Sequence, residues 1–568
     1  MNQTRAFLIF AWLLVAMLLW MEWGKERAAP PPASGPAAPA PAAGADAIPD
    51  AIPDPAALPQ APPDPPVPMA PAAAPAGAAA PAAAPDAVTV ATDVLRVVLD
   101  GGSLRRAELL GYPRDTDDGS PPVRLLSDDP RDYFVAQSGW VRADGAAPTH
   151  ADGFVPALPA RTLTLEPGQD RLEVPFVWNG PDGVGIRRTW TFSRGDYAVT
   201  VRDEVVNAGS APWSGHVYRQ LLRNPPPQAR GFTNPESFSF TGAAWYSPEE
   251  KFEKRKYDDF GDGPLDRQVR GGWLGLLQHY FFAAWIPEPE ATATYSLATV
   301  PAGNDTRFLV RAMGPGVSVA PGQTAQTSAR LWVGPKLQDR LDAVAPGLGL
   351  TLDYGIFTFL AKPIAWLLGQ IEKLTGNWGW AIVLLVVIIK LILYPLSAAQ
   401  YKSAAKMRRF QPRVEQLKER YGDDRQKFQV ALMELYKKEK INPVGGCLPI
   451  LLQIPVFLAL YWVLLESVEL RQAVWIPGWI DDLTARDPYF ILPAVNMAVM
   501  WATQKLTPTP GMDPMQKKMM QLMPIVFGVL MVFFPAGLVL YWVTNGALGL
   551  LQQWWNIRRY GDAPARKA

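Results

Sequence analysis

Long apolar runs separated by polar segments dominate the C-terminal part of the chain. Each of five runs has about the 20 residues that an α-helix needs to cross a bilayer. Tryptophans stand near the ends of several runs, as is common for aromatic residues at membrane interfaces. The pattern predicts five membrane-spanning helices, at about residues 377–396, 445–466, 489–506, 517–534 and 536–555.

A further apolar run, from Ala6 to Met21, follows Arg5 at the N-terminus. Its length fits either a secretory signal or a membrane anchor. Bulky residues follow the run where signal cleavage needs small ones, so we favour an uncleaved anchor over a cleaved signal. Arg5 then stays in the cytoplasm by the positive-inside rule.

Residues 28–87 are almost entirely Ala and Pro, which predicts an extended tether without a folded core. After it, short β-branched and apolar runs alternate with turn residues. One example, residues 186–209, predicts two strands joined at Arg194-Gly195-Asp196. Strands at this spacing predict a large antiparallel β-sandwich, which the anchor would place outside the cytoplasm.

The segment FLAKPIAWLLGQIEKL (359–374) has polar residues between apolar ones and predicts an amphipathic helix at the outer membrane interface. The fold class is therefore a multidomain membrane protein, with a helical core of five spans, an N-terminal anchor span and a periplasmic antiparallel β-sandwich. The expected order is anchor (1–27), tether (28–87), sandwich (88–345), interfacial region (346–375), second span (376–396), basic hairpin (397–444), spans three to six (445–556) and basic tail (557–568).

Loop charge predicts the orientation of these spans. Residues 397–444 hold twelve Lys and Arg, whereas residues 467–488 hold two. The positive-inside rule therefore places 397–444 and both termini in the cytoplasm and the sandwich in the periplasm.

The basic segment also has helical periodicity. Apolar residues recur at three- and four-residue spacing from Met407 to Tyr421 and again from Phe428, and Asp423 or Asp424 fits the N-cap of the second helix. This predicts a helical hairpin, with Pro412 either kinking its first helix or near an irregular start. One interpretation is a solvated loop touching acidic lipid head groups; the other is a docking arm for polypeptide or ribosomal RNA. Its basic candidates are Arg408, Arg409, Arg413, Lys418 and Arg420.

The overall charge adds little information about function, because a formal net charge of +1 gives no global indication of nucleic-acid binding. Cys447 is the single cysteine, so no intrachain disulfide can form, and no histidine follows His279. The predicted spans hold no pair of carboxylates at mid-depth and no phosphate-binding loop, so neither a proton relay nor ATP hydrolysis is indicated. No cofactor or metal is expected.

Lys390 is the single charge expected well inside a span. Its side chain could reach the head groups by snorkelling, because residue 390 lies six residues from the predicted end of its span. The alternative is a charge that faces the interior of the helical core. Several milder polar residues, among them Gln453, Asn496 and Thr544, lie in the other spans.

Many segments together resemble the YidC membrane-protein insertase family of Gram-negative bacteria. They include GNWGWAIVLLVVIIKLILYPL, NPVGGCLPILLQIPVFLALYWVL, DPMQKKMMQLMP and FPAGLVLYWVTN in the core, and GDYAVTV, GGWLGLLQHYF and LWVGP in the sandwich. The resemblance covers nearly the whole chain outside the tether. It implies a non-enzymatic protein that places hydrophobic segments into the inner membrane, alone or beside the Sec translocon.

The resemblance also implies site residues. In that family a hydrophilic groove carries one cation on the first core span, usually arginine, and Lys390 occupies that position. Tyr541 and Trp542 match an aromatic pair that touches substrate, although the second residue is often tyrosine in the family. Expected groove residues are Lys390, Gln453, Asn496, Tyr541, Trp542 and Thr544, and Met519, Met520 and Met523 would form an adaptable surface for apolar substrates or simply fill the core.

The expected partners are nascent membrane proteins, the Sec translocon with its accessory subunits, the ribosome through the basic hairpin and tail, and membrane lipids, with a monomer sufficient. Two alternatives from other classes are a solute or ion transporter and a membrane-tethered periplasmic protein that binds or modifies sugars.

Overall fold

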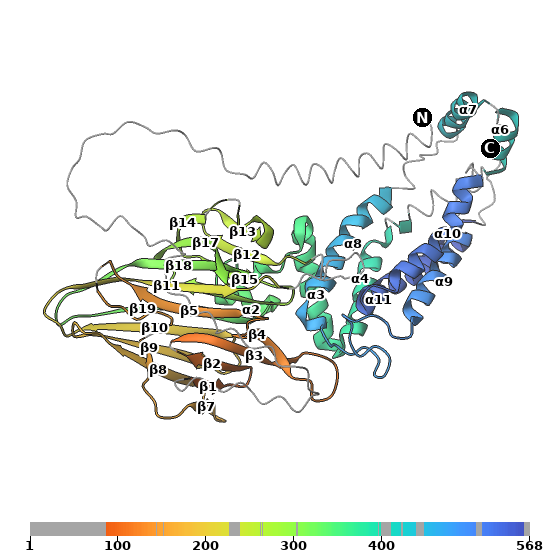
Figure 1. Cartoon of the computed structure of the whole chain (residues 1–568). Coiled ribbons are helices and arrows are strands. Elements are labelled where there is room, and N and C mark those ends of the chain that lie inside the picture. The colour runs from red at the N-terminus through yellow and green to blue at the C-terminus, as the bar shows by residue number, and fades with distance from the viewer. Residues whose placement is uncertain are drawn as a thin grey trace, which may run out of the picture.

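The computed structural model describes residues 87–561 except 101, 144, 152, 227–238, 262, 264, 303–304, 396, 399–410, 422–423, 439–447 and 507–513. The expected anchor, the tether up to residue 86, Arg408, Arg409 and the tail beyond residue 561 lie outside these residues. The described chain forms a β-rich domain and a helical domain, on the left and right of Figure 1.

The β-rich domain contains two large sheets. Within the described residues, the first has ten strands, in the order β14 (Leu265–Arg270), β17 (Thr292–Ala302), β18 (Asp305–Val319), β11 (Trp213–Arg223), β5 (Phe134–Val141), β3 (Ser103–Pro113), β2 (Leu95–Asp100), β1 (Val88–Ala91) and β7 (Thr162–Thr164), with β4 (Pro122–Leu126) paired to β3. The second has nine, in the order β13 (Lys251–Lys256), β12 (Gly242–Ser247), β15 (Trp273–Leu277), β16 (Phe281–Pro287), β19 (Thr324–Pro335), β10 (Ala198–Asn207), β9 (Val184–Ser193), β8 (Arg171–Asn179) and β6 (Val155–Pro156).

Strand pairing confirms most of the predicted pattern. β9 and β10 are antiparallel and are joined around Gly195, whose φ of 68° suits glycine in a tight turn. The prediction of a purely antiparallel sandwich is wrong at one edge of the described sheets, where β1 and β7 pair in parallel. A long excursion between these two short strands lets β7 return in the direction of β1, which strand spacing alone does not show.

The core of the β-rich domain is aromatic and contains one buried ion pair. Six tryptophans are at most 1 % exposed: Trp140, Trp190, Trp213, Trp273, Trp285 and Trp332. On neighbouring strands β9 and β10, Arg188 donates from Nε and Nη2 to the two oxygens of Asp203, at 2.7 Å each. The indole of Trp140 donates to the same carboxylate at 2.8 Å. These bonds compensate for burying both charges completely.

The helical domain begins at α2, after β19 and the following Lys336. Its helices are α2 (Gln338–Val344), α3 (Thr358–Thr375), α4 (Trp378–Ile392), α6 (Gln411–Tyr421), α7 (Arg425–Lys438), α8 (Leu448–Glu466), α9 (Ile491–Leu506), α10 (Pro514–Met531) and α11 (Ala536–Gly561). The predicted helices are thus present, with shifted ends: α4 stops before residue 396, and α11 extends beyond residue 555. In the described ranges, no helix combines the length and apolar character required to span a membrane.

The turn between α3 and α4 shows how local sequence sets these bounds. Gly376 ends α3 in the left-handed conformation, with φ of 62°. Asn377 then caps α4, because its side-chain oxygen accepts from the amide of Trp380 at 3.1 Å. Gly379 follows where a Cβ would lie 2.2 Å from the Trp475 ring, so only glycine allows this loop to close on α4.

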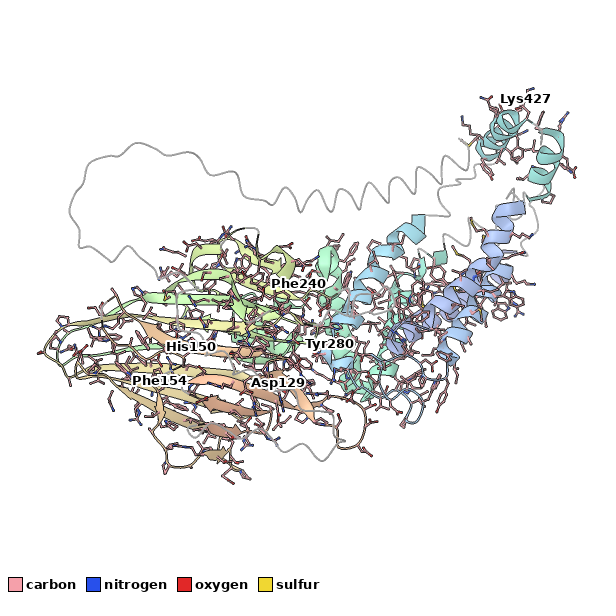
Figure 2. The ribbon with its side chains drawn as sticks, viewed as in Figure 1. Asp129, His150, Phe154, Phe240, Tyr280 and Lys427 are labelled. Atoms are coloured by element: carbon pink, nitrogen blue, oxygen red, sulfur yellow. The ribbon has the colours of Figure 1, made fainter. Side chains whose placement is uncertain are left out.

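The two domains meet at the end of α8. Lys336, just after β19, donates to Glu466 at 3.4 Å, and both side chains are 1 % exposed. Ser239 also donates to Glu466, and His279 Nε2 lies 2.8 Å from the carbonyl oxygen of Leu465. Figure 2 places Phe240 and Tyr280, the neighbours of these residues in sequence, on the helical side of the β-rich domain. Arg471 adds bonds of 2.7 Å to the carbonyl oxygens of Pro113 and Arg114.

Candidate functional site

The Lys390 side chain extends from α4 toward α11. Its Nζ would lie 3.7 Å from a Cβ built on Gly549, and the two helices pack together. Because α4 ends at Ile392, Lys390 is in the last turn of that helix rather than six residues from its end, although Ser397 continues helical bonding to the Leu393 carbonyl. The contact with α11 favours a charge that faces the helical core over one that snorkels along α4.

A second polar contact joins α8 to α11. Gln453 Nε2 donates to Asn545 Oδ1 at 3.2 Å. Asn545 lies one helical turn from Gly549 on α11, since four residues separate them. The structure thus brings Lys390 and Gln453 to the same stretch of α11 from two different helices.

An aromatic cluster lies on the side of this stretch that is nearer the β-rich domain. The Phe457 ring of α8 stacks on Tyr541 at 5.8 Å and lies 4.6 Å from Trp542, both of α11. Phe527 of α10 approaches the Trp542 ring at 6.3 Å. These rings connect three helices, with Tyr541 buried at 4 % exposure and Trp542 partly buried.

Two predicted groove residues do not join these contacts. Asn496, on α9, is 2 % exposed, and its amide approaches the sulfur of Met500 at 3.8 Å within the same helix. It lies only five residues from the start of α9. Thr544 is partly buried on α11.

Helix packing in the helical domain is uneven. α3 packs on α4 and α8, α4 packs on α11, and α9 packs on α10 and α11. α8 also contacts α11, less extensively, whereas α8 and α10 form no extensive contact with each other in the described ranges. On α10, Met519 (61 %) and Met523 (45 %) are exposed, while Met520 is partly buried.

The predicted hairpin consists of α6 and α7, which pack against each other at the upper right of Figure 1. Asp424 caps α7 by accepting from the amides of Gln426 and Lys427 at 3.1 Å each, and these bonds, that of Lys427 first, lower its pKa. This confirms the predicted cap. Pro412 is the second described residue of α6, and residues 399–410 before it lie outside the described residues, so its predicted kink or irregular start stays a prediction.

Of the basic candidates in the hairpin, Arg413 and Arg420 are exposed, and Arg420 lies over the Tyr421 ring at 5.8 Å. Arg408, Arg409 and the Lys418 side chain lie outside the described residues. Figure 2 shows Lys427 at the far end of the molecule from the β-rich domain.

In the described ranges, no group of three or more His, Cys, Asp or Glu side chains is arranged to hold a metal ion. The histidines have structural roles: His150 Nδ1 lies 2.7 Å from the Tyr218 hydroxyl, and burial lowers the pKa of His150 to about 4. His150 is therefore neutral at physiological pH.

Sequence reasoning missed three residues of this site. Asn545 and Phe457 are identified as site residues only by their contacts with side chains on other helices. Gly549 has no side chain, so the sequence gives no chemical reason to select it. The helical spacing of Tyr541, Asn545 and Gly549 (i, i+4, i+8) is a signal that places all three on one face of α11.

Known proteins match the chain over nearly its whole length. Residues 87–367 match the YidC periplasmic domain family, and residues 370–563 match the 60Kd inner membrane protein family. A membrane protein insertase YidC from Stenotrophomonas maltophilia is 58 % identical over 574 aligned residues, covering 99 % of this chain and 98 % of that protein. The chain belongs to the YidC family of membrane protein insertases. A second YidC insertase, from Xanthomonas euvesicatoria, is 57 % identical and covers 100 % of this chain and 99 % of its own.

Membership of the YidC family confirms the predicted insertase function and the absence of enzymatic activity, against the transporter and sugar-active alternatives. The YidC family is one of inner-membrane proteins with a periplasmic domain, and its substrates are membrane proteins. Among solved structures, an active YidC insertase matches at 19 % identity with a TM-score of 0.36, covering 83 % of this chain and 92 % of that one.

Proposed function

We propose that this chain inserts hydrophobic segments by drawing their polar flank into a groove beside the Lys390 ammonium. The observation that carries the proposal is the position of this ammonium against α11, next to the Gln453–Asn545 contact. A positive charge in surroundings of low dielectric constant attracts an acidic or polar flank more strongly than it does in bulk water. One charge holds the flank too weakly to trap it.

The apolar part of the substrate then leaves between α8 and α10. The helix packing supports this route, because in the described ranges these two helices form no extensive contact with each other. Met519, Met520 and Met523 of α10 provide adaptable side chains along the route. The cluster of Phe457, Tyr541 and Trp542 seals the groove on the periplasmic side, which keeps the flank from passing straight through.

The membrane topology that we propose has six spans: the N-terminal anchor, α4, α8, α9, α10 and α11. Both termini and the hairpin are cytoplasmic, and the β-rich domain is periplasmic. The distribution of Lys and Arg, twelve in residues 397–444 against two in residues 467–488, supports this orientation. In the same arrangement α3 lies in the outer interface, with Phe359, Trp366 and Leu374 exposed to lipid.

The partners that we propose follow from the same surfaces. The basic hairpin and tail contact the ribosome or acidic lipid head groups, and the Sec translocon passes some substrates to a single copy of this chain. Thr544 contributes a polar group to the groove wall as substrates enter, and Asn496 contributes one deeper in the wall, near the start of α9.

Depleting the chain and following a small two-span substrate by protease protection tests the proposal. Without the insertase, we expect the loop of the substrate to stay on the cytoplasmic side, where protease added to that face of the membrane can digest it. Photo-crosslinkers at Tyr541 and Gln453 in the intact chain should capture stalled nascent substrates. Insertion at the normal rate without the chain, or the absence of such crosslinks, would contradict the proposal.

A further inference from the structure

Gly549 is the residue of α11 that faces the Lys390 ammonium. A Cβ at position 549 would lie 3.7 Å from Nζ, which is ordinary van der Waals contact. A single methyl group therefore fits at this position, whereas a longer side chain would occupy the space of the ammonium. The contact is specific to this glycine, because the Cβ of the nearby Gly546 would meet Val499 of α9 instead.

Lys390 and Gly549 also lie at similar distances from the starts of their helices. Lys390 is 12 residues beyond Trp378 at the start of α4, and Gly549 is 13 residues beyond Ala536 at the start of α11. At 1.5 Å per residue these are about 18 and 20 Å along the respective helices. Since α4 and α11 pack together, the contact is at the level expected from the course of both helices.

Glycine has a cost at this position. In a helix interior it is less favourable than alanine, because it has more backbone freedom to lose on folding. α11 nevertheless has glycine here, and the Cβ that it lacks would point at a charged group. The physical advantage of glycine at position 549 is that it leaves space for the Lys390 ammonium.

We infer that Gly549 is a positioning residue for Lys390: the absence of a side chain on α11 lets the ammonium lie inside the helical core, where it selects substrates with acidic or polar translocated flanks. This inference rests on the proposed function of Lys390. Filling position 549 turns the ammonium away from the groove without removing its charge from the protein.

The experiment compares two forms of one substrate, with an acidic and with an uncharged translocated tail, in cells that depend on each insertase variant. Gly549→Leu should reduce insertion of the acidic form by at least about fivefold, the Boltzmann factor of one ion pair at 4 Å even in water, and leave the uncharged form unchanged. Gly549→Ala should reduce insertion of the acidic form less than Gly549→Leu does, because a methyl group fits beside the ammonium. Gly369→Leu is the matched control, because a Cβ at Gly369 of α3 has no neighbour within 4 Å.

A double-variant cycle separates positioning from packing. If Gly549 acts through Lys390, adding Gly549→Leu to Lys390→Met should cause no further loss with the acidic substrate. Gly549→Val, with a smaller side chain, provides the same comparison if the leucine variant fails to accumulate. Equal losses for both substrate forms, additive losses in the cycle, or normal acidic insertion by the leucine and valine variants would each overturn the inference.

The cycle also distinguishes this inference from the proposed function. Normal insertion of the acidic substrate by Lys390→Met alone would refute the role of the charge itself. A loss with Lys390→Met and none with Gly549→Leu would refute only the role of the glycine.

Discussion

Lys336 and Glu466 form an ion pair between the two domains, with Nζ and Oε2 3.4 Å apart and both side chains 1 % exposed. The residues are 130 positions apart in sequence. Because water cannot solvate either charge at such burial, each depends on the other and on the neighbouring Ser239 hydroxyl. The pair therefore holds the β-rich domain to the end of α8.

Removing one partner of this pair should destabilise the docked arrangement. We expect Glu466→Ala to lower the free energy of unfolding by about 3–5 kcal/mol, since Lys336 would remain buried without a counter-charge. The double variant Lys336→Met/Glu466→Leu should recover most of that loss. Thermal unfolding of the purified full chain measures both, with Glu250→Ala as a control that breaks the exposed pair with Arg267. A single variant as stable as the control would contradict the prediction.

The same junction should respond to pH through Glu469. Burial, followed by the charge of Asp339, raises the pKa of this carboxyl from 4.5 to about 7. A raised pKa means that the folded protein holds the proton longer than the unfolded chain does. Stability should therefore be fully present below pH 4.5 and fall as pH rises toward 7, by no more than about 3 kcal/mol.

Unfolding curves across this pH range, recorded for the native chain and for Glu469→Gln, isolate the effect. The glutamine variant should lack this component of the pH dependence, because its side chain does not titrate. Parallel curves for the two proteins would show that Glu469 does not carry it.

Substitutions of Lys390 should separate substrates by their charge. Lys390→Arg should retain insertion, whereas Lys390→Ala and Lys390→Glu should impair substrates with acidic translocated tails by about fivefold or more. Substrates passed through the Sec translocon should be least affected. The measurement is protease protection of the translocated tail after a short labelling pulse. Full insertion of acidic-tailed substrates by Lys390→Glu would restore snorkelling as the better explanation.

The hairpin should be separable from the helical domain. Deleting residues 398–441 should impair insertion without lowering the thermal stability of the remainder, since α6 and α7 pack on each other. A finer test is Asp424→Ala, which removes the N-cap of α7, against Asp424→Asn, which keeps a capping oxygen. Circular dichroism of the isolated hairpin peptide should show less helix for the alanine variant than for the asparagine variant, and normal insertion after the deletion would contradict a role in substrate capture.

Crosslinking should decide what the methionines of α10 contact. Photo-crosslinkers at Met519 and Met523 should capture nascent chains, because both side chains are exposed on α10. A probe at the buried Leu492 of α9 is the control and should react only within the protein. Crosslinks from the α10 positions to neighbouring helices alone would indicate that the methionines fill the core.

Local sequence patterns predicted the elements well where neighbouring residues determine them. Apolar periodicity located the described α-helices from α3 onward but not α2, which lies within the range assigned to the sandwich, and the Asp424 cap follows from a hydrogen bond within three residues. Helix ends were less predictable: α4 stops early, at Ile392, and α11 continues past residue 555 through the charged Arg558, which an apolar pattern does not include. The parallel pairing of β1 and β7 was missed because register between distant strands leaves no local trace.

Contacts between distant segments explain what remained hidden at the site. Lys390 was recognisable because a charge in an apolar run is expensive. Its neighbour Gly549 was not, because the contact depends on how α4 and α11 pack. Glu466 looked like a residue near a helix end, and its partner Lys336 lies in a different domain.

The position of β19 determines when the nine-stranded sheet can form during protein synthesis. It is the last strand in sequence, yet it lies between β16 and β10 and joins the two halves of the nine-stranded sheet. The ribosome synthesises the strands of both halves before it synthesises β19, which connects them. The nine-stranded sheet is therefore incomplete until Pro335 has been synthesised. Only about 40 residues then separate its completion from the start of α4 at Trp378. At about 5–20 residues per second, the newly completed sheet has roughly 2–8 seconds before the first core helix emerges.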